Sequence, residues 1–333
     1  MKRTIAAMAV CASLLAAVLG ATVANADPSG SPTFRQLSGV GSDTVQGVMN
    51  GLSNTTTIDG TKVIGSYDAV GTANITTKDP TVNPNCTIPR PNGSNAGRAA
   101  LLNSLQPGSP TAGCLDFSRS SSLNLAAASP GLTYIPFAVD AVTYAITPTS
   151  SIPRKLALTD LQAIYHCNPA FVGTGPNYSI TVYLPQAGSG TRSFWEATMG
   201  ITDADVVAGV YPCIHDTKNG LPVEEHDGRI LDDISIAPFS IAQYVSQSTQ
   251  TIPDIRGRAI LGTIDGLTPV TLNGSFGVKR DVYNVIATTN VGVAPWSTVF
   301  VGPNSLICQQ TSLINSYGFA ANPNCGSTTN HTP

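Results

Sequence analysis

Two turns rich in glycine and hydroxyl residues stand directly before helix-like segments, and their chemistry suits an anion or a polar ligand. They comprise Ser42, Asp43 and Thr44 in the first turn and Gly188, Ser189, Gly190 and Thr191 in the second. A helix N-terminus leaves backbone N–H groups unpaired and carries the positive end of the helix dipole. Glycine lets the backbone approach a ligand closely, and Ser and Thr add rotatable donors. Each turn taken alone is better explained as an ordinary helix cap, so the two must converge to indicate a binding site.

Two further turns have a similar composition. Ser66 lies in the segment GSYD after the strand-like KVI, and the segment FSRSSS contains Ser118, Arg119, Ser120 and Ser121. Arg119 stands among hydroxyls in a chain with few cations, and its guanidinium could share one oxyanion with them. The alternative is a surface arginine with no ligand.

Enzyme and metal chemistry have weaker support. A hydrolase would use Ser189 as nucleophile with His226 and Asp227 as base and orienting group. However, GSGT is not the G-x-S-x-G elbow of serine hydrolases, and EEHDG has the composition of a solvated turn. No C-x-x-C or H-x-x-x-H spacing is present. We therefore expect no enzyme activity, no metal and no cofactor.

Strand-like and helix-like segments alternate along the chain, which predicts an α/β fold. Val45, Val48, Met49 and Leu52 have the spacing of one buried helical stripe, and Ser42 and Asp43 are placed to cap that helix. A second helix is predicted after GSGT, with Phe194, Ala197 and Thr198 on one face and Gly200 at its end.

A secretory leader is predicted at residues 1–26. Lys2 and Arg3 precede an apolar stretch that ends in Ala24-Asn25-Ala26, so we expect cleavage after Ala26. No other apolar run approaches the roughly 20 residues of a membrane-spanning helix. We expect a protein that is secreted or held in the cell envelope.

Six cysteines follow the leader, and an even number in an exported chain predicts three disulfides. Sequence alone does not separate the 15 possible pairings. We favour pairing of neighbours: Cys86 with Cys114, Cys167 with Cys213, and Cys308 with Cys325.

Composition and charge bound the remaining classes. Charged residues are only 11% of the chain and hydrophobic residues are 42%, which indicates a globular protein with a surface of Ser, Thr, Asn and Gly. Without Lys2 and Arg3 the chain has 15 basic and 20 acidic residues, a net charge of -5. That sign disfavours sequence-independent nucleic-acid binding. The length after the leader suits two lobes of about 150 residues each.

Several segments, taken in order, resemble the type II periplasmic-binding-protein superfamily, and most of all the phosphate-binding subunits of bacterial phosphate ABC transporters. They are GVGSDTVQ, IGSYDAVG, LDFSRSSS, YIPFAVDAVTYAI, LTDLQAIYHCNP, LPQAGSGTRSFW and VKRDVYNVIA. The resemblance spans nearly the whole chain after the leader, and GSGT ahead of a helix is its most specific motif.

This resemblance implies a two-lobed clamshell whose chain crosses the hinge twice. Lobe I would comprise residues 27–139 and 278–333, and lobe II residues 140–277. A small anion, best matched by phosphate, would bind in the interlobe cleft, held by the hydroxyl turns of both lobes. The family also implies an ABC permease as partner and a monomer. The alternative is a secreted surface or adhesion protein that retains the clamshell.

Three positions depart from the family pattern. The family commonly has an arginine and an aspartate before GSGT, where this chain has Pro185 and Ala187. Ser121 stands where the family usually presents an aspartate, and Asp43 stands in place of a hydroxyl. Either Arg119 supplies the donors and Asp43 the acceptor that rejects sulfate-like anions, or Asp43 caps its helix and the pocket has changed ligand. Asp140, near the hinge, either pairs with Arg119 or is an ordinary hinge carboxylate; Arg192 is a further charge near the cleft.

Overall fold

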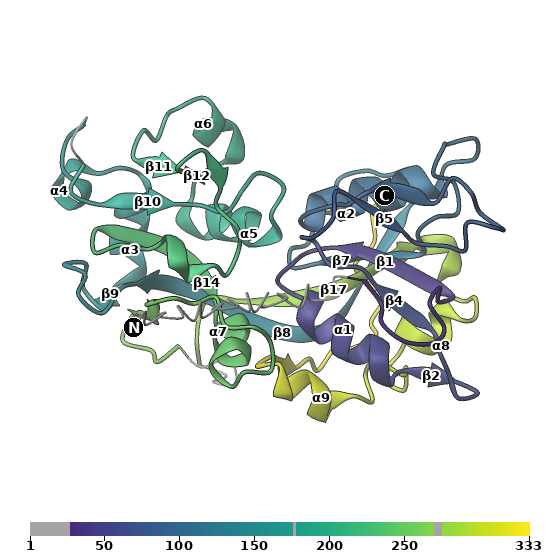
Figure 1. Cartoon of the computed structure of the whole chain (residues 1–333). Helices are drawn as coiled ribbons and strands as arrows, with labels where there is room; N and C mark the ends of the chain where they lie inside the picture. Colours follow the sequence, from purple (N-terminus) through teal and green to yellow (C-terminus); the bar gives the residue numbers. More distant parts are fainter. Residues whose placement is uncertain (1–26, 176–177, 270–274) are drawn as a thin grey trace, which may run out of the picture.

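The computed structural model describes residues 27–175, 178–269 and 275–333 (Figure 1). The expected leader and its cleavage after Ala26 lie outside the described residues. Within the described ranges, no helix combines the length and apolar character needed to span a membrane.

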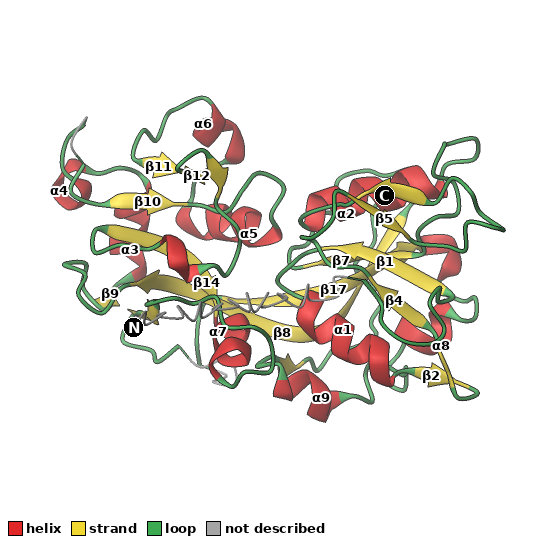
Figure 2. Ribbon diagram, in the orientation of Figure 1, coloured by secondary structure: helices red, strands yellow, loops and turns green. Residues whose placement is uncertain are grey.

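One mixed sheet runs through two lobes (Figure 2). Its strands follow the order β11-β10-β14-β8-β17-β7-β1-β4, and β15 and β18 also pair with β8. Their bounds are β1 Leu37–Gly41, β4 Ile64–Ser66, β7 Phe117–Ser120, β8 Leu132–Ile146, β10 Thr181–Tyr183, β11 Ile214–His215, β14 Ser235–Ser240, β15 Ile260–Leu261, β17 Lys279–Ala287 and β18 Ala320–Ala321. Short pairs outside this sheet are β2 Thr57–Ile58 with β3 Thr61–Lys62, β5 Asn74–Thr76 with β6 Thr87–Pro89, β9 Lys155–Leu156 with β16 Thr263–Ile264, and β12 Thr217–Lys218 with β13 Leu221–Pro222.

Helices pack around the sheet in both lobes (Figure 2). Lobe I carries α1 Gln46–Thr55, α2 Ser94–Leu105, α8 Trp296–Phe300 and α9 Thr311–Ser316. Lobe II carries α3 Leu158–Tyr165, α4 Pro169–Val172, α5 Gly190–Met199, α6 Asp203–Val207 and α7 Ile241–Ser248. Helix α7 lies against both lobes, because Ile241 packs in the core of lobe II and Ala242 in that of lobe I.

The long antiparallel strands β8 and β17 form the two crossings between the lobes (Figure 1). Ile135 in the first half of β8 packs in the core of lobe I, and Tyr144 in its second half packs in the core of lobe II. The α/β clamshell with two hinge crossings is therefore confirmed. The expected boundaries after residues 139 and 277 fall within β8 and just before β17, and we keep them as our division of the chain.

The apolar stripe of α1 is confirmed, since the four predicted side chains are all fully buried in the core of lobe I. The predicted cap is wrong. Val45 occupies the N-cap of α1 with no side-chain hydrogen bond, and the Ser42 hydroxyl donates elsewhere. Helix α5 does end at Gly200, which has a left-handed φ of 73°. The face that it buries carries Trp195 and Met199, whereas Phe194 and Thr198 are half-buried and Ala197 is exposed.

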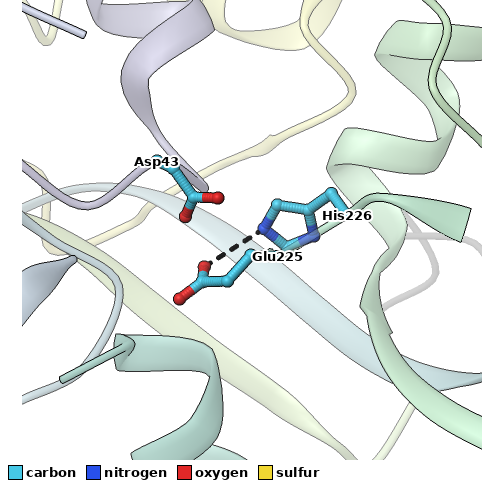
Figure 3. A group of neighbouring side chains, drawn as sticks. All are labelled: Asp43, Glu225 and His226. Carbon is cyan, nitrogen blue, oxygen red and sulfur yellow. Dashed lines mark ion pairs between the residues drawn. The ribbon is translucent and has the colours of Figure 1, made fainter. Parts of the chain in front are cut away.

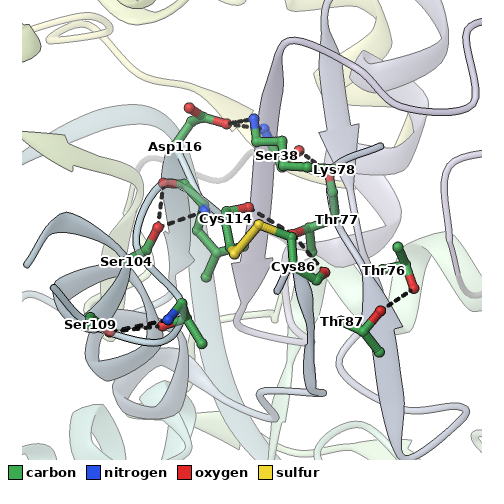
Figure 4. The surroundings of a disulfide bond; sticks show 12 residues. Ser38, Thr76, Thr77, Lys78, Cys86, Thr87, Ser104, Ser109, Cys114 and Asp116 are labelled. Carbon is green, nitrogen blue, oxygen red and sulfur yellow. Dashed lines mark hydrogen bonds and ion pairs between the residues drawn. A yellow bond between two sulfur atoms is a disulfide. The ribbon is translucent and has the colours of Figure 1, made fainter. Parts of the chain in front are cut away.

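The three predicted disulfides are formed: Cys86–Cys114, Cys167–Cys213 and Cys308–Cys325. Around the first, a hydroxyl group satisfies a neighbouring backbone carbonyl, because Thr77 donates to the Cys114 oxygen at 2.7 Å (Figure 4). Disulfides of this kind are typical of proteins outside the cytoplasm.

Candidate functional site

Parallel strand ends bring the hydroxyl turns of lobe I to one edge of the sheet. Strand β1 pairs in parallel with both β4 and β7, so the residues that follow these strands meet. Ser42 follows β1, Ser66 ends β4, and Ser121 follows β7. Ligands of open α/β sheets bind at such an edge, beyond the carboxyl ends of the strands.

The turn of lobe II that carries GSGT lies directly against this edge. The Ser42 hydroxyl donates to Ser121 Oγ at 3.0 Å, and the Ser121 backbone N–H donates to Ser94 Oγ at 3.1 Å. A side-chain carbon added to Gly190 would lie 2.3 Å from Ser94 Oγ and 2.4 Å from Ser121 Oγ. The backbone N–H of Asn95 also donates to the Gly188 carbonyl at 3.1 Å. The two lobes therefore meet at the N-termini of α2 and α5, where unpaired N–H groups and dipole ends favour negative charge.

Not every predicted hydroxyl takes part in this junction. Ser189 caps α5 by accepting the Arg192 N–H at 3.0 Å. The Ser120 hydroxyl donates to the Ser122 carbonyl at 2.6 Å, and Ser118 Oγ is buried without a hydrogen-bond partner among the described residues. The predicted set thus divides into hydroxyls at the interlobe junction and hydroxyls that serve their own segment.

Arg119 is fully buried at this edge, so its interpretation as a surface arginine is wrong. Its Nη1 donates to Ser66 Oγ at 2.9 Å, and its Nε donates to the Ser42 carbonyl at 3.3 Å. Burial lowers the pKa of Arg119 to about 10, while the carboxylates of Asp68 and Asp43 favour its charged form. Arg119 therefore places a positive charge beneath the turns that follow β1 and β4.

The suggested pairing of Asp140 with Arg119 is also wrong. Asp140 Oδ2 accepts from Arg280 Nη2 at 2.9 Å, and its Oδ1 accepts from the Ser240 hydroxyl at 2.8 Å. Arg280 and Asp140 face each other because they are partners in the β8–β17 register. The Arg280 Nη2 also donates to Thr191 Oγ1 at 2.9 Å, which links the hinge to the GSGT turn.

Arg192 serves its own helix and the neighbouring loops. The three guanidinium nitrogens of Arg192 each face one carboxylate oxygen: Nε lies 2.9 Å from Glu196 Oε1, Nη2 lies 2.6 Å from Asp203 Oδ1, and Nη1 lies 2.9 Å from Asp216 Oδ2. These three acids surround one fully buried guanidinium, so Arg192 acts as a structural ion-pair centre in lobe II.

The segment EEHDG is not the solvated turn that its composition indicates, because Glu225 and His226 are both buried. Glu225 Oε2 accepts from the Thr44 hydroxyl at 2.6 Å and the Thr191 hydroxyl at 3.0 Å. His226 Nε2 lies 2.9 Å from Thr44 Oγ1 and 3.3 Å from Glu225 Oε2. Since Thr44 belongs to lobe I, this network joins the two lobes a second time.

Asp43 completes a compact group with Glu225 and His226, and one donor atom from each lies within 4.8 Å of the others (Figure 3). Burial and the adjacent Glu225 carboxylate raise the pKa of Asp43 well above its usual range. Burial opposes ionisation of Glu225 as well, but hydrogen bonds from Asp43, His226 and Thr44 hold its pKa below the usual range. The expectation of no metal site rested on the spacing of ligands along the sequence. A group whose members come from both lobes has no such spacing.

A cleft of about 630 Å³ opens beside this group, between α1 of lobe I and α7 of lobe II. The ionisable residues of its lining are mainly acidic, with Arg229 and His226 as the basic groups among the carboxylates Asp43, Asp68, Glu224, Glu225 and Asp227. This differs from the expectation of an anion-binding cleft. A fully ionised anion would be favoured at the hydroxyl junction and disfavoured in the open cleft.

The residues required by the hydrolase alternative do not come together. Ser189 Oγ accepts from the α5 backbone, whereas the His226 ring contacts Thr44 and Glu225. Asp227 pairs with Arg229 at 2.6 Å. Among the described residues, no hydrogen bond connects Ser189 to His226.

Several site residues escaped the sequence analysis, namely Ser94, Glu225, His226 in this role, and Arg280. Ser94 had a usable signal, because the segment NGSN precedes a helix-like run as the other turns do. The other three had none, since their burial results from contacts between residues more than 50 positions apart.

Comparisons with known proteins place this geometry in context. No family model matches the chain, and no curated protein matches it. Solved structures do match. A putative phosphate ABC transporter substrate-binding protein from Clostridium perfringens, with bound phosphate, aligns over 86% of this chain and 99% of its own, with 16% identity and a TM-score of 0.55. An ABC-type phosphate transport receptor from Vibrio cholerae aligns over 86% of this chain and 100% of its own, with 16% identity and a TM-score of 0.50.

At this identity the likeness concerns the fold. It agrees with the two lobes, the shared sheet and the paired crossing strands. The chain therefore has the type II periplasmic-binding-protein fold and is structurally similar to phosphate-binding proteins of ABC transporters.

Proposed function

We propose that this chain is an exported solute-binding protein that captures a small oxyanion, phosphate in the first instance, between its lobes for an ABC transporter. The observation that carries the proposal is the meeting of Ser42, Ser94 and Ser121 with the N-terminus of α5 across the interlobe junction. Hydroxyls and helix N-termini from opposite lobes form a set that only a closed clamshell assembles.

The three hydroxyl groups belong to lobe I and hydrogen-bond within it, and in the closed form the N-terminus of α5 from lobe II packs against them. When the lobes separate, that helix end leaves the lobe I hydroxyls, and an oxyanion with several acceptor oxygens can bind between the two sides. The proposed ligand groups are the hydroxyls of Ser42, Ser94 and Ser121 and the backbone N–H groups of Gly188, Gly190 and Thr191. Arg119 supplies positive charge beneath them through Ser66, and Asp43 and Thr44 lie beside them. The hydroxyls of Ser120 and Ser189 are excluded because they bond their own segments, and Ser118 stays an untested member of the predicted set. Ligand would then shift the population toward closure.

The carboxyl groups beside the junction favour a protonated oxyanion. Glu225 is a buried carboxylate beside the GSGT turn, and its pKa lies below the usual range. Hydrogen phosphate carries a proton that such a carboxylate can accept, whereas sulfate carries none. We therefore expect phosphate to bind in preference to sulfate.

Isothermal titration calorimetry of the secreted protein, freed of phosphate by dialysis, tests the proposal. Phosphate should give saturable heat that is absent with equal concentrations of sulfate. A Ser42→Ala/Ser121→Ala variant should bind phosphate at least tenfold more weakly, whereas Ser312→Ala, on the exposed side of α9, should bind as the wild type does. No heat at millimolar phosphate, or full binding by the double variant, would refute it.

The expected export, cleavage after Ala26 and monomeric state belong to the same proposal. N-terminal sequencing of protein recovered from the culture medium checks the cleavage. An intact N-terminus at Met1 would contradict it.

A further inference from the structure

The group formed by Asp43, Glu225 and His226 has the composition of a transition-metal site. It offers one imidazole nitrogen and two carboxylates, all within 4.8 Å of one another. Borderline divalent cations such as Zn²⁺ prefer this mixture of nitrogen and oxygen donors, whereas Mg²⁺ and Ca²⁺ prefer oxygen alone.

Donor atoms of this group are buried and lack partners within the described part of the chain. Asp43 Oδ1, Glu225 Oε1 and His226 Nδ1 are all buried without a hydrogen bond. The Asp43 carboxylate points toward Glu225 and His226 (Figure 3). Two buried carboxylates side by side require a proton or a cation between them, because neighbouring like charges in a low dielectric repel strongly.

The spacing of the donors suits a shared cation. Two ligand atoms at about 2.1 Å from one tetrahedral zinc lie about 3.4 Å apart. His226 Nε2 and Glu225 Oε2 are 3.3 Å apart. The Thr44 hydroxyl now contacts both atoms, at 2.9 and 2.6 Å, and has to turn aside when a cation takes its place. One carboxylate oxygen of Asp43 lies within 4.8 Å of the donor atoms of Glu225 and His226.

Hydroxyl groups already orient the Glu225 carboxylate. Thr44 donates to its Oε2 at 2.6 Å and Thr191 donates at 3.0 Å, while Oε1 has no partner. Hydroxyls that hold a ligating carboxylate in this way are the usual support of a metal ligand. The supporting groups come from both lobes, as do the ligands.

We propose that Asp43, Glu225 and His226 bind a divalent transition-metal cation of the Zn²⁺ class across the interlobe closure. Asp43 belongs to lobe I, and Glu225 and His226 belong to lobe II. The cation therefore bridges the closed form and stabilises it against opening. Three protein ligands leave a coordination position for water or for a solute oxygen. The bound charge also offsets the acidic lining of the adjacent cleft.

Metal titration of chelator-treated, extensively dialysed full-length protein, in a buffer without phosphate, tests this inference. We expect one equivalent of Zn²⁺ to bind in calorimetry and to raise the melting temperature, with Mn²⁺ and Co²⁺ acting in the same direction. Mg²⁺ and Ca²⁺ at the same concentrations should leave the melting temperature unchanged. X-ray absorption of the zinc-loaded protein should show one imidazole and oxygen ligands.

Variants that each remove one ligand atom separate this site from adventitious binding. Asp43→Asn, Glu225→Gln and His226→Asn should each weaken zinc binding at least tenfold. His215→Asn, which removes an exposed imidazole of lobe II, is the matched control and should bind zinc as the wild type does. Where a variant fails to fold, the wild-type absorption spectrum decides. No zinc binding by the wild type, unchanged binding by the folded variants, or a spectrum without an imidazole ligand would overturn the proposal.

The outcome is independent of solute capture. Zinc binding is measured without phosphate, and phosphate binding is measured again in chelator-treated protein. Failure of the phosphate titration would leave the zinc result standing, and failure of the zinc titration would leave the phosphate result standing.

Discussion

Gly190 is the position where the smallest change should open the clamshell. It is the first residue of α5, and an added Cβ would lie 2.3 Å from Ser94 Oγ and 2.4 Å from Ser121 Oγ in the opposite lobe. Cβ atoms in proteins stay at least 3.0 Å from such neighbours. In a Gly190→Ala variant the two lobes must therefore retreat by about 0.7 Å at this point, or the Ser94 and Ser121 hydroxyls must rotate out of their hydrogen bonds.

The cost should fall on closure rather than on folding. Overpacking of a close contact costs about 1 to 3 kcal/mol. Each lobe keeps its own core, and Ala in place of Gly stabilises a helix by up to about 1 kcal/mol. A bias of about 1 to 3 kcal/mol toward the open form lowers the closed population, and with it the apparent solute affinity, by about 5-fold to 150-fold.

Small-angle X-ray scattering and phosphate calorimetry measure the two consequences. Ligand-free Gly190→Ala should have a larger radius of gyration than the wild type, a nearly unchanged melting temperature and weaker phosphate binding. Gly292→Ala is the control, because an added Cβ there meets nothing within 4 Å. An unchanged radius of gyration together with affinity within twofold of the wild type would refute the reasoning.

Two further predictions concern charges in the hinge and in lobe II. Asp140→Ala leaves the Arg280 guanidinium buried without its carboxylate partner, so the free energy of unfolding should fall by about 3 to 5 kcal/mol in urea denaturation. A loss below about 1 kcal/mol would show that the pair does not stabilise the hinge. Burial raises the pKa of Glu196 to about 7 against the opposing effect of Arg192, so the folded protein holds this proton while the unfolded chain releases it near pH 4.5. The free energy of unfolding of the wild type should therefore fall by about 1 to 2 kcal/mol as the pH rises from 5 to 8. This figure is smaller than the full pKa shift implies, because the neighbouring acids Asp203 and Asp216 are exposed and solvent screens their charges. The Glu196→Gln variant should lack this loss. Thermal unfolding of both proteins across this range provides the comparison, and identical pH slopes would contradict the assignment.

Local patterns predicted the parts of the molecule that are set by local physics. The spacing of Val45, Val48, Met49 and Leu52 determines which face of α1 is buried, whatever that face packs against. The even cysteine count and the favoured neighbour pairing agree with the bridges, which span 28, 46 and 17 positions along the chain. Alternating strand-like and helix-like segments indicated the α/β class.

The site was predicted only in part because closure assembles it. Ser42 and Ser121 meet through parallel strand order, which the resemblance supplied. Glu225 and His226 have the polarity of a surface turn, and only their contact with Thr44, about 180 residues away along the chain, buries them. The prediction that Asp43 caps α1 is wrong because of a contact between the lobes: the Asp43 carboxyl group lies beside Glu225 of lobe II rather than on the N-terminus of α1.

Each of the three disulfides joins two cysteines of the same lobe. Cys86–Cys114 is buried in a core of lobe I, Cys308–Cys325 fastens the C-terminal part of the same lobe, and Cys167–Cys213 joins two loops of lobe II. None of these three disulfides links lobe I to lobe II. The disulfides therefore stiffen each lobe separately and place no covalent restraint on the opening between the lobes, so the stability of a lobe and the angle between the lobes depend on different interactions.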